Sequence, residues 1–341
     1  MKKTALSLGL AMALIGPAST SQAATELNFA TWMPPGHPIN ATILPQWAKQ
    51  IEAGTEGRVS VKFEYNLGEP GSMFSIAEDG VADGAWGFHG YVPGRFPLNE
   101  AVEMPMLGAN AEAASVSFWN VYNEYFAKAG EFDGLELMAL CTHGQGQLHT
   151  KFPINALSDL KGKKIRVGGG VQSEIAKRMQ VTPVAAPGPK IYELLQQGVI
   201  DGITMPQSEQ RGLRLNEVTS HLTVYPSGLY LGSLSIFLNP DFMANLSDED
   251  RAAIRRVSGE SLSRTCGQAF DAADEDGIKA ARENGVIVNE LHPGDALTQE
   301  LTNVLEGIDQ VWLEKTSASG VDNKAALQAL RQRARDYQPE S

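Results

Sequence analysis

Arg166 is the residue with the clearest chemical meaning in the sequence, because it stands near the end of a short apolar segment that runs into three consecutive glycines. Residues 164–167 have the pattern of a strand, and Gly168, Gly169 and Gly170 form the loop after it. A guanidinium in this position can grip a small carboxylate with two parallel hydrogen bonds. The arrangement favours the capture of a small anion over the turnover of a large substrate.

Strands and helices must position Arg166, and the patterns typical of these elements alternate along the chain. The strand patterns lie at residues 27–31, 59–65, 84–89, 135–141, 164–167, 182–185 and 202–205, and the helix patterns lie at 39–53, 72–79, 111–129, 172–179 and 191–197. This alternation predicts an α/β fold with largely parallel sheets, which bind ligands at the carboxyl ends of their strands.

A long helical pattern follows Ser247, which is a favourable N-terminal cap, and continues to Asn284. A helix of about 36 residues would span about 54 Å, which exceeds one small domain. We therefore expect it to link two lobes of a hinged clamshell. Gly259, Gly267 and Gly277 lie inside the pattern, and bending should cost least at these glycines.

The first residues have the features of an export signal. Lys2 and Lys3 precede a short apolar run at residues 5–15, and a small-x-small pattern ends at Ala23. These features predict a secretory signal peptide at residues 1–23, cleaved near Ala23, and a periplasmic location. The apolar run is shorter than the roughly 20 residues that a membrane span needs.

Length, charge and cysteine content narrow the class of protein. A chain of 341 residues is long enough for two domains. The net charge of -12 argues against a nucleic-acid partner, which requires a basic face. Cys141 and Cys266 are too few for a disulfide framework. One bridge in an oxidising compartment and two buried free thiols both remain open.

The sequence offers little support for catalysis or metal binding. It contains neither a Gly-x-Ser-x-Gly elbow nor a His-Glu-x-x-His motif. The six histidines are scattered along the chain, and His143 and His149 are too far apart along one strand to share a metal ion. We therefore expect a protein that is not an enzyme and that carries no cofactor and no metal. An exported hydrolase is the alternative class.

Several motifs, taken in order, resemble the periplasmic solute-binding subunits of tripartite ATP-independent periplasmic (TRAP) transporters, the DctP-like family. The resemblance covers nearly all of the chain after residue 23. The motifs are Trp32-x-x-Pro-x-His37-Pro, Gly57-Arg58-Val59, Val81-x-Asp83-Gly84-Ala85, Leu157-x-Asp159-Leu160-x-Gly162-Lys163-Lys164-Ile165-Arg166 and Ile191-Tyr192-Glu193-Leu194-Leu195-x-x-Gly198-Val199-Ile200-Asp201-Gly202.

The resemblance implies a two-lobed periplasmic binding protein with its ligand in the cleft between the lobes. We expect residues 24–142 and 236–265 to form the N-terminal lobe, and residues 143–235 and 266–341 the second. The family implies that Arg166 holds the carboxylate of a small organic solute. It also implies delivery to a small DctQ-like and a large DctM-like permease subunit in the membrane.

This sequence also departs from the family pattern. Many relatives have an asparagine that touches the ligand where this chain has Met205, and a second arginine frequent in the hinge strand is missing near Gln145. The pocket is thus less cationic than in a dicarboxylate binder. A small monocarboxylate is our first expectation. A small amine or amino alcohol, such as an ethanolamine-like ligand, is the alternative.

Aromatic side chains near the expected cleft would serve the alternative, because aromatic faces bind cations. Trp32, Trp86, Phe88, Tyr91 and Tyr230 are such residues, and Glu103 could then balance an ammonium. Core packing is the other explanation for these aromatics. The expected ligand-binding residues are Arg166, Trp32, His89, Trp86, Met205, Gly169, Gln145 and Tyr230.

Overall fold

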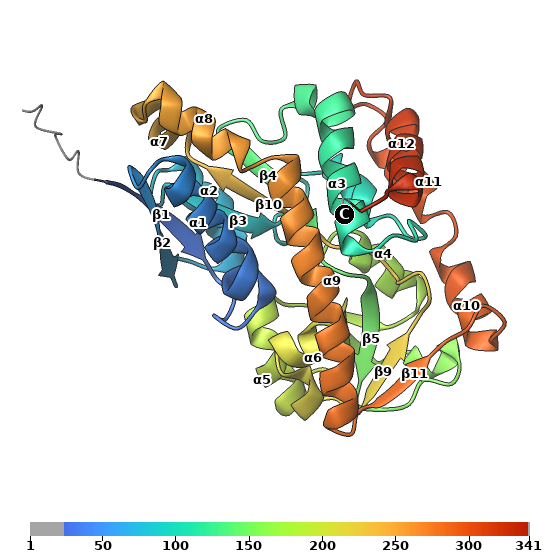
Figure 1. The fold of residues 1–341 in the computed structure, drawn as a ribbon. Helices are drawn as coiled ribbons and strands as arrows, with labels where there is room; N and C mark the ends of the chain where they lie inside the picture. The colour runs from blue at the N-terminus through green and yellow to red at the C-terminus, as the bar shows by residue number, and fades with distance from the viewer. Residues whose placement is uncertain (1–23, 340–341) are drawn as a thin grey trace, which may run out of the picture.

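The structure is a computed structural model that describes residues 24–339. The expected signal peptide lies outside the described residues. The described chain forms two β-sheets, each flanked by helices, and helix α9 (Glu260–Glu283) passes along both of them (Figure 1). This architecture confirms the expected two-lobed α/β fold. No helix among residues 24–339 is long and apolar enough to cross a membrane.

The first sheet, called lobe A together with its helices, has the strand order β2-β1-β3-β10-β4. Its strands are β1 (Thr25–Thr31), β2 (Val59–Tyr65), β3 (Gly84–Phe88), β4 (Glu136–Thr142) and β10 (Ser233–Leu238). Strands β1, β2 and β3 are parallel, whereas β10 is antiparallel to both β3 and β4.

The second sheet, called lobe B together with its helices, has the order β11-β9-β5-β8-β6-β7. Its strands are β5 (Gly146–Thr150), β6 (Lys164–Val167), β7 (Thr182–Ala185), β8 (Gly202–Pro206), β9 (His221–Val224) and β11 (Ile287–Glu290). Strand β5 is antiparallel to β8 and β9. Both sheets are mixed, but in the described residues each has a single reversed strand, β10 in lobe A and β5 in lobe B, so the expectation of largely parallel sheets is confirmed. The chain enters β5 when it first crosses from lobe A to lobe B, and it enters β10 when it returns.

The helices cover these sheets and close the ends of the molecule. They are α1 (Leu44–Gly54), α2 (Met73–Glu78), α3 (Ala111–Val121), α4 (Val171–Arg178), α5 (Ile191–Gln196), α6 (Glu209–Gly212), α7 (Pro240–Asn245), α8 (Asp248–Arg256), α9 (Glu260–Glu283), α10 (Ala296–Leu305), α11 (Ile308–Lys315) and α12 (Asn323–Asp336). Helix α9 packs on α3 and β4 of lobe A and on α6 and β11 of lobe B, so it links the lobes as expected.

The long helical pattern is broken near its start. The structure has two helices, α8 and α9, because Gly259 adopts a positive φ of 66° between them. Gly267 and Gly277 lie inside α9 at close contacts. A Cβ atom at Gly277 would lie 2.1 Å from the carbonyl oxygen of Gln207, and one at Gly267 would lie 2.4 Å from the Cα of Glu112. These two glycines let α9 approach the backbone of both lobes.

The C-terminal helices lie where the sequence did not place them. Helix α12 packs on α3 of lobe A. In α11, Trp312 donates a hydrogen bond to the carbonyl oxygen of Pro97 at 2.8 Å, also in lobe A. Helix α12 thus contacts lobe A, whereas α11 also contacts α4 of lobe B, so the two helices do not both follow the expected assignment of residues 266–341. Strand β10 begins at Ser233, three residues before the expected boundary at 236.

Cys141 and Cys266 form a disulfide bond with a Cα–Cα distance of 6.1 Å. Cys141 belongs to β4 and Cys266 to α9, and both are fully buried. Of the two possibilities that the sequence left open, the structure has the bridge. The bond ties the linking helix to the sheet of lobe A.

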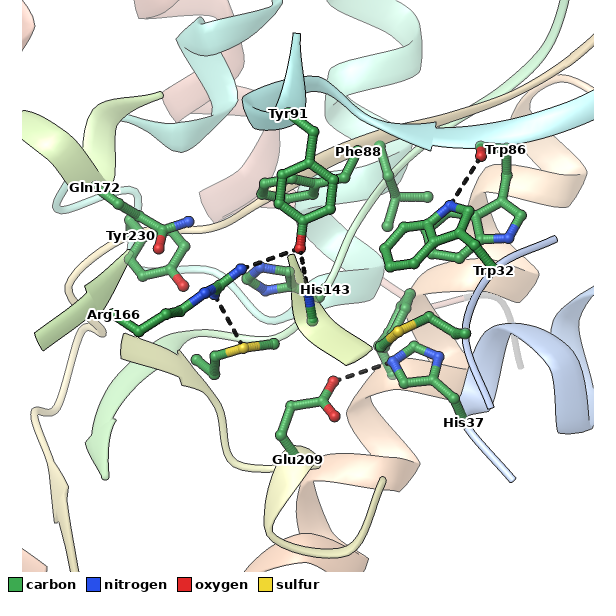
Figure 2. A pocket seen from close by; sticks show the side chains of 15 residues that line it. Trp32, His37, Trp86, Phe88, Tyr91, His143, Arg166, Gln172, Glu209 and Tyr230 are labelled. Carbon is green, nitrogen blue, oxygen red and sulfur yellow. Dashed lines mark hydrogen bonds and ion pairs between the residues drawn. The ribbon is translucent and has the colours of Figure 1, made fainter. Parts of the chain in front are cut away.

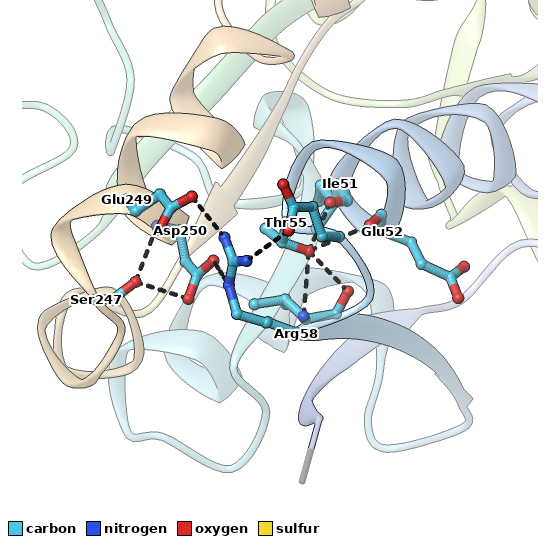
Figure 3. A network of polar contacts seen from close by, with 9 residues as sticks. Ile51, Glu52, Thr55, Arg58, Ser247, Glu249 and Asp250 are labelled. Atoms are coloured by element: carbon cyan, nitrogen blue, oxygen red, sulfur yellow. Dashed lines mark hydrogen bonds and ion pairs between the residues drawn. The ribbon is translucent and has the colours of Figure 1, made fainter. Parts of the chain in front are cut away.

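Arg58 ends the loop before β2 and forms ion pairs with acidic residues of α8 in lobe A (Figure 3). Its Nε donates to Asp250 at 2.9 Å, and its Nη2 lies 3.0 Å from Glu249. Asp250 in turn accepts a hydrogen bond from Ser247, the N-terminal cap of α8. The Gly57-Arg58-Val59 motif therefore joins β2 to α8 within lobe A, and none of its residues lines the cavity described below.

Candidate functional site

A cavity lies between the two sheets, and its walls come from both lobes (Figure 2). About 460 Å³ of space between its walls is not filled by protein atoms, and this figure includes space that is open to solvent. Its lining residues are Trp32, Met33, His37, Trp86, Phe88, Tyr91, His143, Arg166, Gln172, Gly188, Met205, Glu209, Tyr230, Leu234 and Phe270.

Arg166 supplies the positive charge of the cavity. Strand β6 carries it, and the residue is only 2% exposed. Its Nε donates to the carbonyl oxygen of Ala186 at 2.7 Å, its Nη1 to Sδ of Met205 at 3.2 Å and its Nη2 to the hydroxyl of Tyr91 at 3.0 Å.

Those three bonds leave part of the guanidinium unused. Arginine has five N–H donors, two of them on each terminal nitrogen. One donor on Nη1 and one on Nη2 therefore have no protein acceptor among residues 24–339, and no carboxylate in this range pairs with Arg166. A buried guanidinium without a carboxylate partner and with two free donors is suited to a bidentate anion.

The wall opposite Arg166 is aromatic. The rings of Trp32 and Trp86 stack at a centroid distance of 4.1 Å, and Tyr91 lies against both Trp32 and Phe88. The indole nitrogens are occupied, because Trp32 donates to the carbonyl oxygen of Trp86 and Trp86 donates to Thr31. The cavity therefore meets the apolar faces of these rings, which suit a flat apolar ligand body.

His37 and Glu209 form a buried polar pair at the edge of the cavity. Nε2 of His37 lies 3.0 Å from Oε1 of Glu209, and the backbone N–H of Ile39 donates to Nδ1. Because Nδ1 accepts, the proton is assigned to Nε2, which donates to the carboxylate. His37 follows β1 of lobe A and Glu209 begins α6 of lobe B, so this contact joins the lobes.

His143 is a neutral member of the lining. Burial lowers the pKa of its imidazole to about 4. Its Nδ1 lies 2.6 Å from the carbonyl oxygen of Gly144, to which it donates. The ring stacks on Phe88 and meets Tyr230 edge to face. His143 therefore adds an uncharged flat surface to the cavity.

The structure brings together five of the eight residues expected to bind ligand. Arg166, Trp32, Trp86, Met205 and Tyr230 all line this cavity. The hydroxyl of Tyr230 donates to the carbonyl oxygen of Thr204 at 3.1 Å. Burial raises the pKa of Tyr230, so the phenol stays protonated.

The expectation that His89 contacts the ligand is corrected. Successive residues of a strand point to opposite faces of the sheet. Because Trp86 and Phe88 of β3 face the cavity, His89 points to the other side. There its Nε2 lies 3.0 Å from the hydroxyl of Ser235 and its ring stacks on Phe96. Burial lowers the pKa of His89 to about 3.

Gly169 and Gln145 also lie outside the cavity. Gly169 meets the backbone of Gly90, since a Cβ atom at Gly169 would lie 2.1 Å from that carbonyl oxygen. Gln145 donates to the carbonyl oxygen of Ala109 at 3.3 Å. Glu103 is buried elsewhere, where it accepts hydrogen bonds from Ser233 and Val171.

Some lining residues were not among the expected ligand-binding residues. Tyr91 and Phe88 were recognised as aromatics near the cleft, but Gln172, Glu209, Leu234 and Phe270 have no local signal that separates them from structural residues. His37 lies in the Trp32-x-x-Pro-x-His37-Pro motif, which could have marked it. Among the described residues, no group of three or more histidine, cysteine, aspartate or glutamate side chains is placed to hold a metal ion.

Comparisons with known proteins give the family. The model of bacterial extracellular solute-binding protein family 7, DctP, matches residues 29–314. A curated relative from Comamonas testosteroni, named outer membrane transporter protein TsaT, is 31% identical over 88% of this chain and 89% of its own length.

Two solved structures share the fold. A TRAP periplasmic solute-binding protein from Bordetella bronchiseptica, with bound (R)- and (S)-mandelate, has a TM-score of 0.88 and 33% identity, covering 91% of this chain and 99% of that one. A TRAP solute-binding protein from Rhodoferax ferrireducens, with copurified benzoate, has a TM-score of 0.86 and 27% identity. The match covers 92% of this chain and 98% of that one. The chain described here therefore belongs to the DctP family, family 7 of the bacterial extracellular solute-binding proteins.

Proposed function

We propose that this protein is the periplasmic solute-binding subunit of a TRAP transporter and that it captures an aromatic monocarboxylate. It hands this ligand to the small DctQ-like and large DctM-like permease subunits in the membrane. In this role the protein binds and releases its solute without changing it, so it is not an enzyme and uses no cofactor.

The observation that carries this proposal is the state of Arg166. A guanidinium that is 2% exposed, has two free donors and has no carboxylate partner among the described residues invites an anion into the cavity. Its two free donors match the two oxygens of one carboxylate. The lining of the cavity contains no second arginine and no lysine, so a ligand with one carboxylate fits it better than a ligand with two.

The rest of the lining supports an aromatic body for the ligand. Trp32, Trp86 and Phe88 present ring faces, and Met205 presents a thioether that adapts to apolar shapes. The related proteins with 33% and 27% identity carry mandelate and benzoate, which are both aromatic monocarboxylates.

The amine alternative is not proposed, because the cavity carries an arginine charge that repels an ammonium group. Glu103, the carboxylate expected to balance an ammonium, does not line this cavity, and Glu209, which does line it, accepts a hydrogen bond from His37. The carboxylate of Glu103 accepts hydrogen bonds from Ser233 and Val171 instead.

A thermal-shift screen tests the proposal, because a ligand that binds only the folded state raises the unfolding temperature. The set should contain benzoate, mandelate, phenylacetate, succinate, benzylamine and ethanolamine. We expect the three aromatic monocarboxylates to raise the unfolding temperature, and succinate and the two amines to leave it unchanged. Stabilisation by an amine alone would overturn the proposal.

A further inference from the structure

The hydroxyl of Tyr91 has an unusual set of partners. Nη2 of Arg166 donates to it at 3.0 Å, and the backbone N–H of Gly188 donates to it at 2.8 Å. A phenol oxygen accepts through its lone pairs and donates one proton. Both bonds use the oxygen as acceptor, and among residues 24–339 the proton of Tyr91 has no acceptor.

This free proton lies beside the free donors of Arg166. Tyr91 lines the same cavity, and Figure 2 shows its hydroxyl directed at the guanidinium. A positive charge and a backbone N–H already surround the phenol oxygen, so the group that best accepts its proton carries negative charge. A carboxylate on Arg166 would bring an oxygen next to Nη2, and therefore next to Tyr91.

We propose that Tyr91 donates a third hydrogen bond to the ligand's carboxylate and thereby couples ligand binding to the contact between the lobes. This inference rests on the proposed function, since it needs an anionic ligand on Arg166. Tyr91 follows β3 of lobe A, whereas Arg166 and Gly188 belong to lobe B. One hydroxyl thus receives two bonds from lobe B and gives one to the ligand.

Tyr225 provides a matched comparison outside the cavity. It is buried but does not line the cavity, and its hydroxyl lies 2.8 Å from the hydroxyl of Thr302. The same chemical change should therefore have different outcomes at the two tyrosines. Tyr91→Phe removes a donor to the ligand, and Tyr225→Phe removes only an internal bond.

Isothermal titration calorimetry with benzoate tests this, with the tightest-binding acid of the thermal-shift screen as a second probe. We expect Tyr91→Phe to weaken binding about tenfold or more, as for a lost hydrogen bond to a charged group. Tyr225→Phe, which lies outside the cavity, should stay within about threefold of the wild type. The unfolding temperature of unliganded Tyr91→Phe should fall, because Nη2 of Arg166 and the backbone N–H of Gly188 lose their acceptor.

Two results would overturn the inference. The first is an affinity of Tyr91→Phe within twofold of the wild type. The second is an equal loss of affinity in both tyrosine variants, which would show that the loss is not specific to a bond with the ligand. Arg166→Met separates this test from the proposed function, because unchanged benzoate binding there refutes the proposed function itself. If no acid binds the wild-type protein, both proposals fall.

Discussion

Arg166 and Met205 meet across neighbouring strands of lobe B, where Nη1 of the arginine donates to Sδ of the methionine at 3.2 Å. A thioether is a weak acceptor, so this bond does not neutralise the buried guanidinium. Met205 occupies the position where many relatives are expected to have a ligand-contacting asparagine. The side of the cavity that it covers is therefore apolar.

Met205 should contribute shape more than hydrogen bonding. We expect Met205→Leu, which keeps the volume, to bind benzoate within about threefold of the wild type. Met205→Asn should gain nothing for benzoate and should shift preference toward more polar acids, because its amide needs partners that an aromatic ligand lacks. Calorimetry with benzoate and a hydroxylated acid measures both. No change in any affinity would place Met205 outside the ligand contact.

Glu103 and Asp274 should make stability fall as pH rises. Burial raises the pKa of each carboxyl to about 7, from ordinary values of 4.5 and 3.8. Between about pH 4 and pH 7 the folded protein keeps protons that the unfolded chain releases. These two carboxyl groups therefore lower the free energy of unfolding of the protein as pH rises through that range. Buried His89, His143 and His149 act in the opposite direction, since burial lowers the pKa of each.

Asp274→Asn isolates this effect, because the histidine contributions cancel when variant and wild type are compared. Asn keeps an acceptor for the backbone N–H of Ser208, which donates to Asp274 at 2.7 Å. We expect the variant to gain at least about 2 °C on the wild type between pH 4.5 and pH 8 in thermal unfolding. Exposed Asp276→Asn on the same helix is the control. Parallel pH profiles for Asp274→Asn and the wild type would refute the effect.

Gly277 should resist substitution although it lies inside a helix. Alanine normally favours a helix over glycine by about 1 kcal/mol. At Gly277 its Cβ would lie 2.1 Å from the carbonyl oxygen of Gln207, so Gly277→Ala should destabilise by roughly 1–3 kcal/mol in urea unfolding. Gly54→Ala is the control, since that Cβ meets Ala253 at an ordinary 3.6 Å. Stabilisation of both variants would contradict the close approach of α9.

The disulfide between Cys141 and Cys266 should support stability and leave binding alone. It closes a loop with a sequence separation of 125. Loop-closure entropy for such a loop is worth at most about 5 kcal/mol. We expect the Cys141→Ala/Cys266→Ala double variant to lose about 2–5 kcal/mol in urea unfolding. Its benzoate affinity should stay near that of the wild type, because neither cysteine lines the cavity. Equal unfolding free energies would contradict this role.

Local patterns predicted β1 to β4 and β6 to β8, but the expected strands did not include β5, β9, β10 and β11. Residues 164–167 form β6 and residues 59–65 form β2 with the expected bounds, because apolar residues and flanking glycines define short strands locally. Arg166 was found for the same reason, since its place at the end of β6 depends on neighbouring residues alone.

Contacts between the lobes could not be read from the sequence. Tyr91 and Arg166 are 75 residues apart and His37 and Glu209 are 172 apart, so only the folded arrangement shows that they meet. The error at His89 has a simpler cause. The pleat of β3 turns this residue away from the cavity, and the strand ends one residue before it.

Calorimetric titration of benzoate into wild-type protein, Arg166→Met and Arg214→Met tests the central claim most directly. Arg214 is an exposed arginine paired with Glu217, so its variant controls for the loss of one positive charge. We predict saturable one-site binding to the wild type and to Arg214→Met, and binding at least about 30-fold weaker to Arg166→Met, which should keep its fold. Wild-type affinity in Arg166→Met would contradict the account, because the buried guanidinium would then not be the anchor of the ligand.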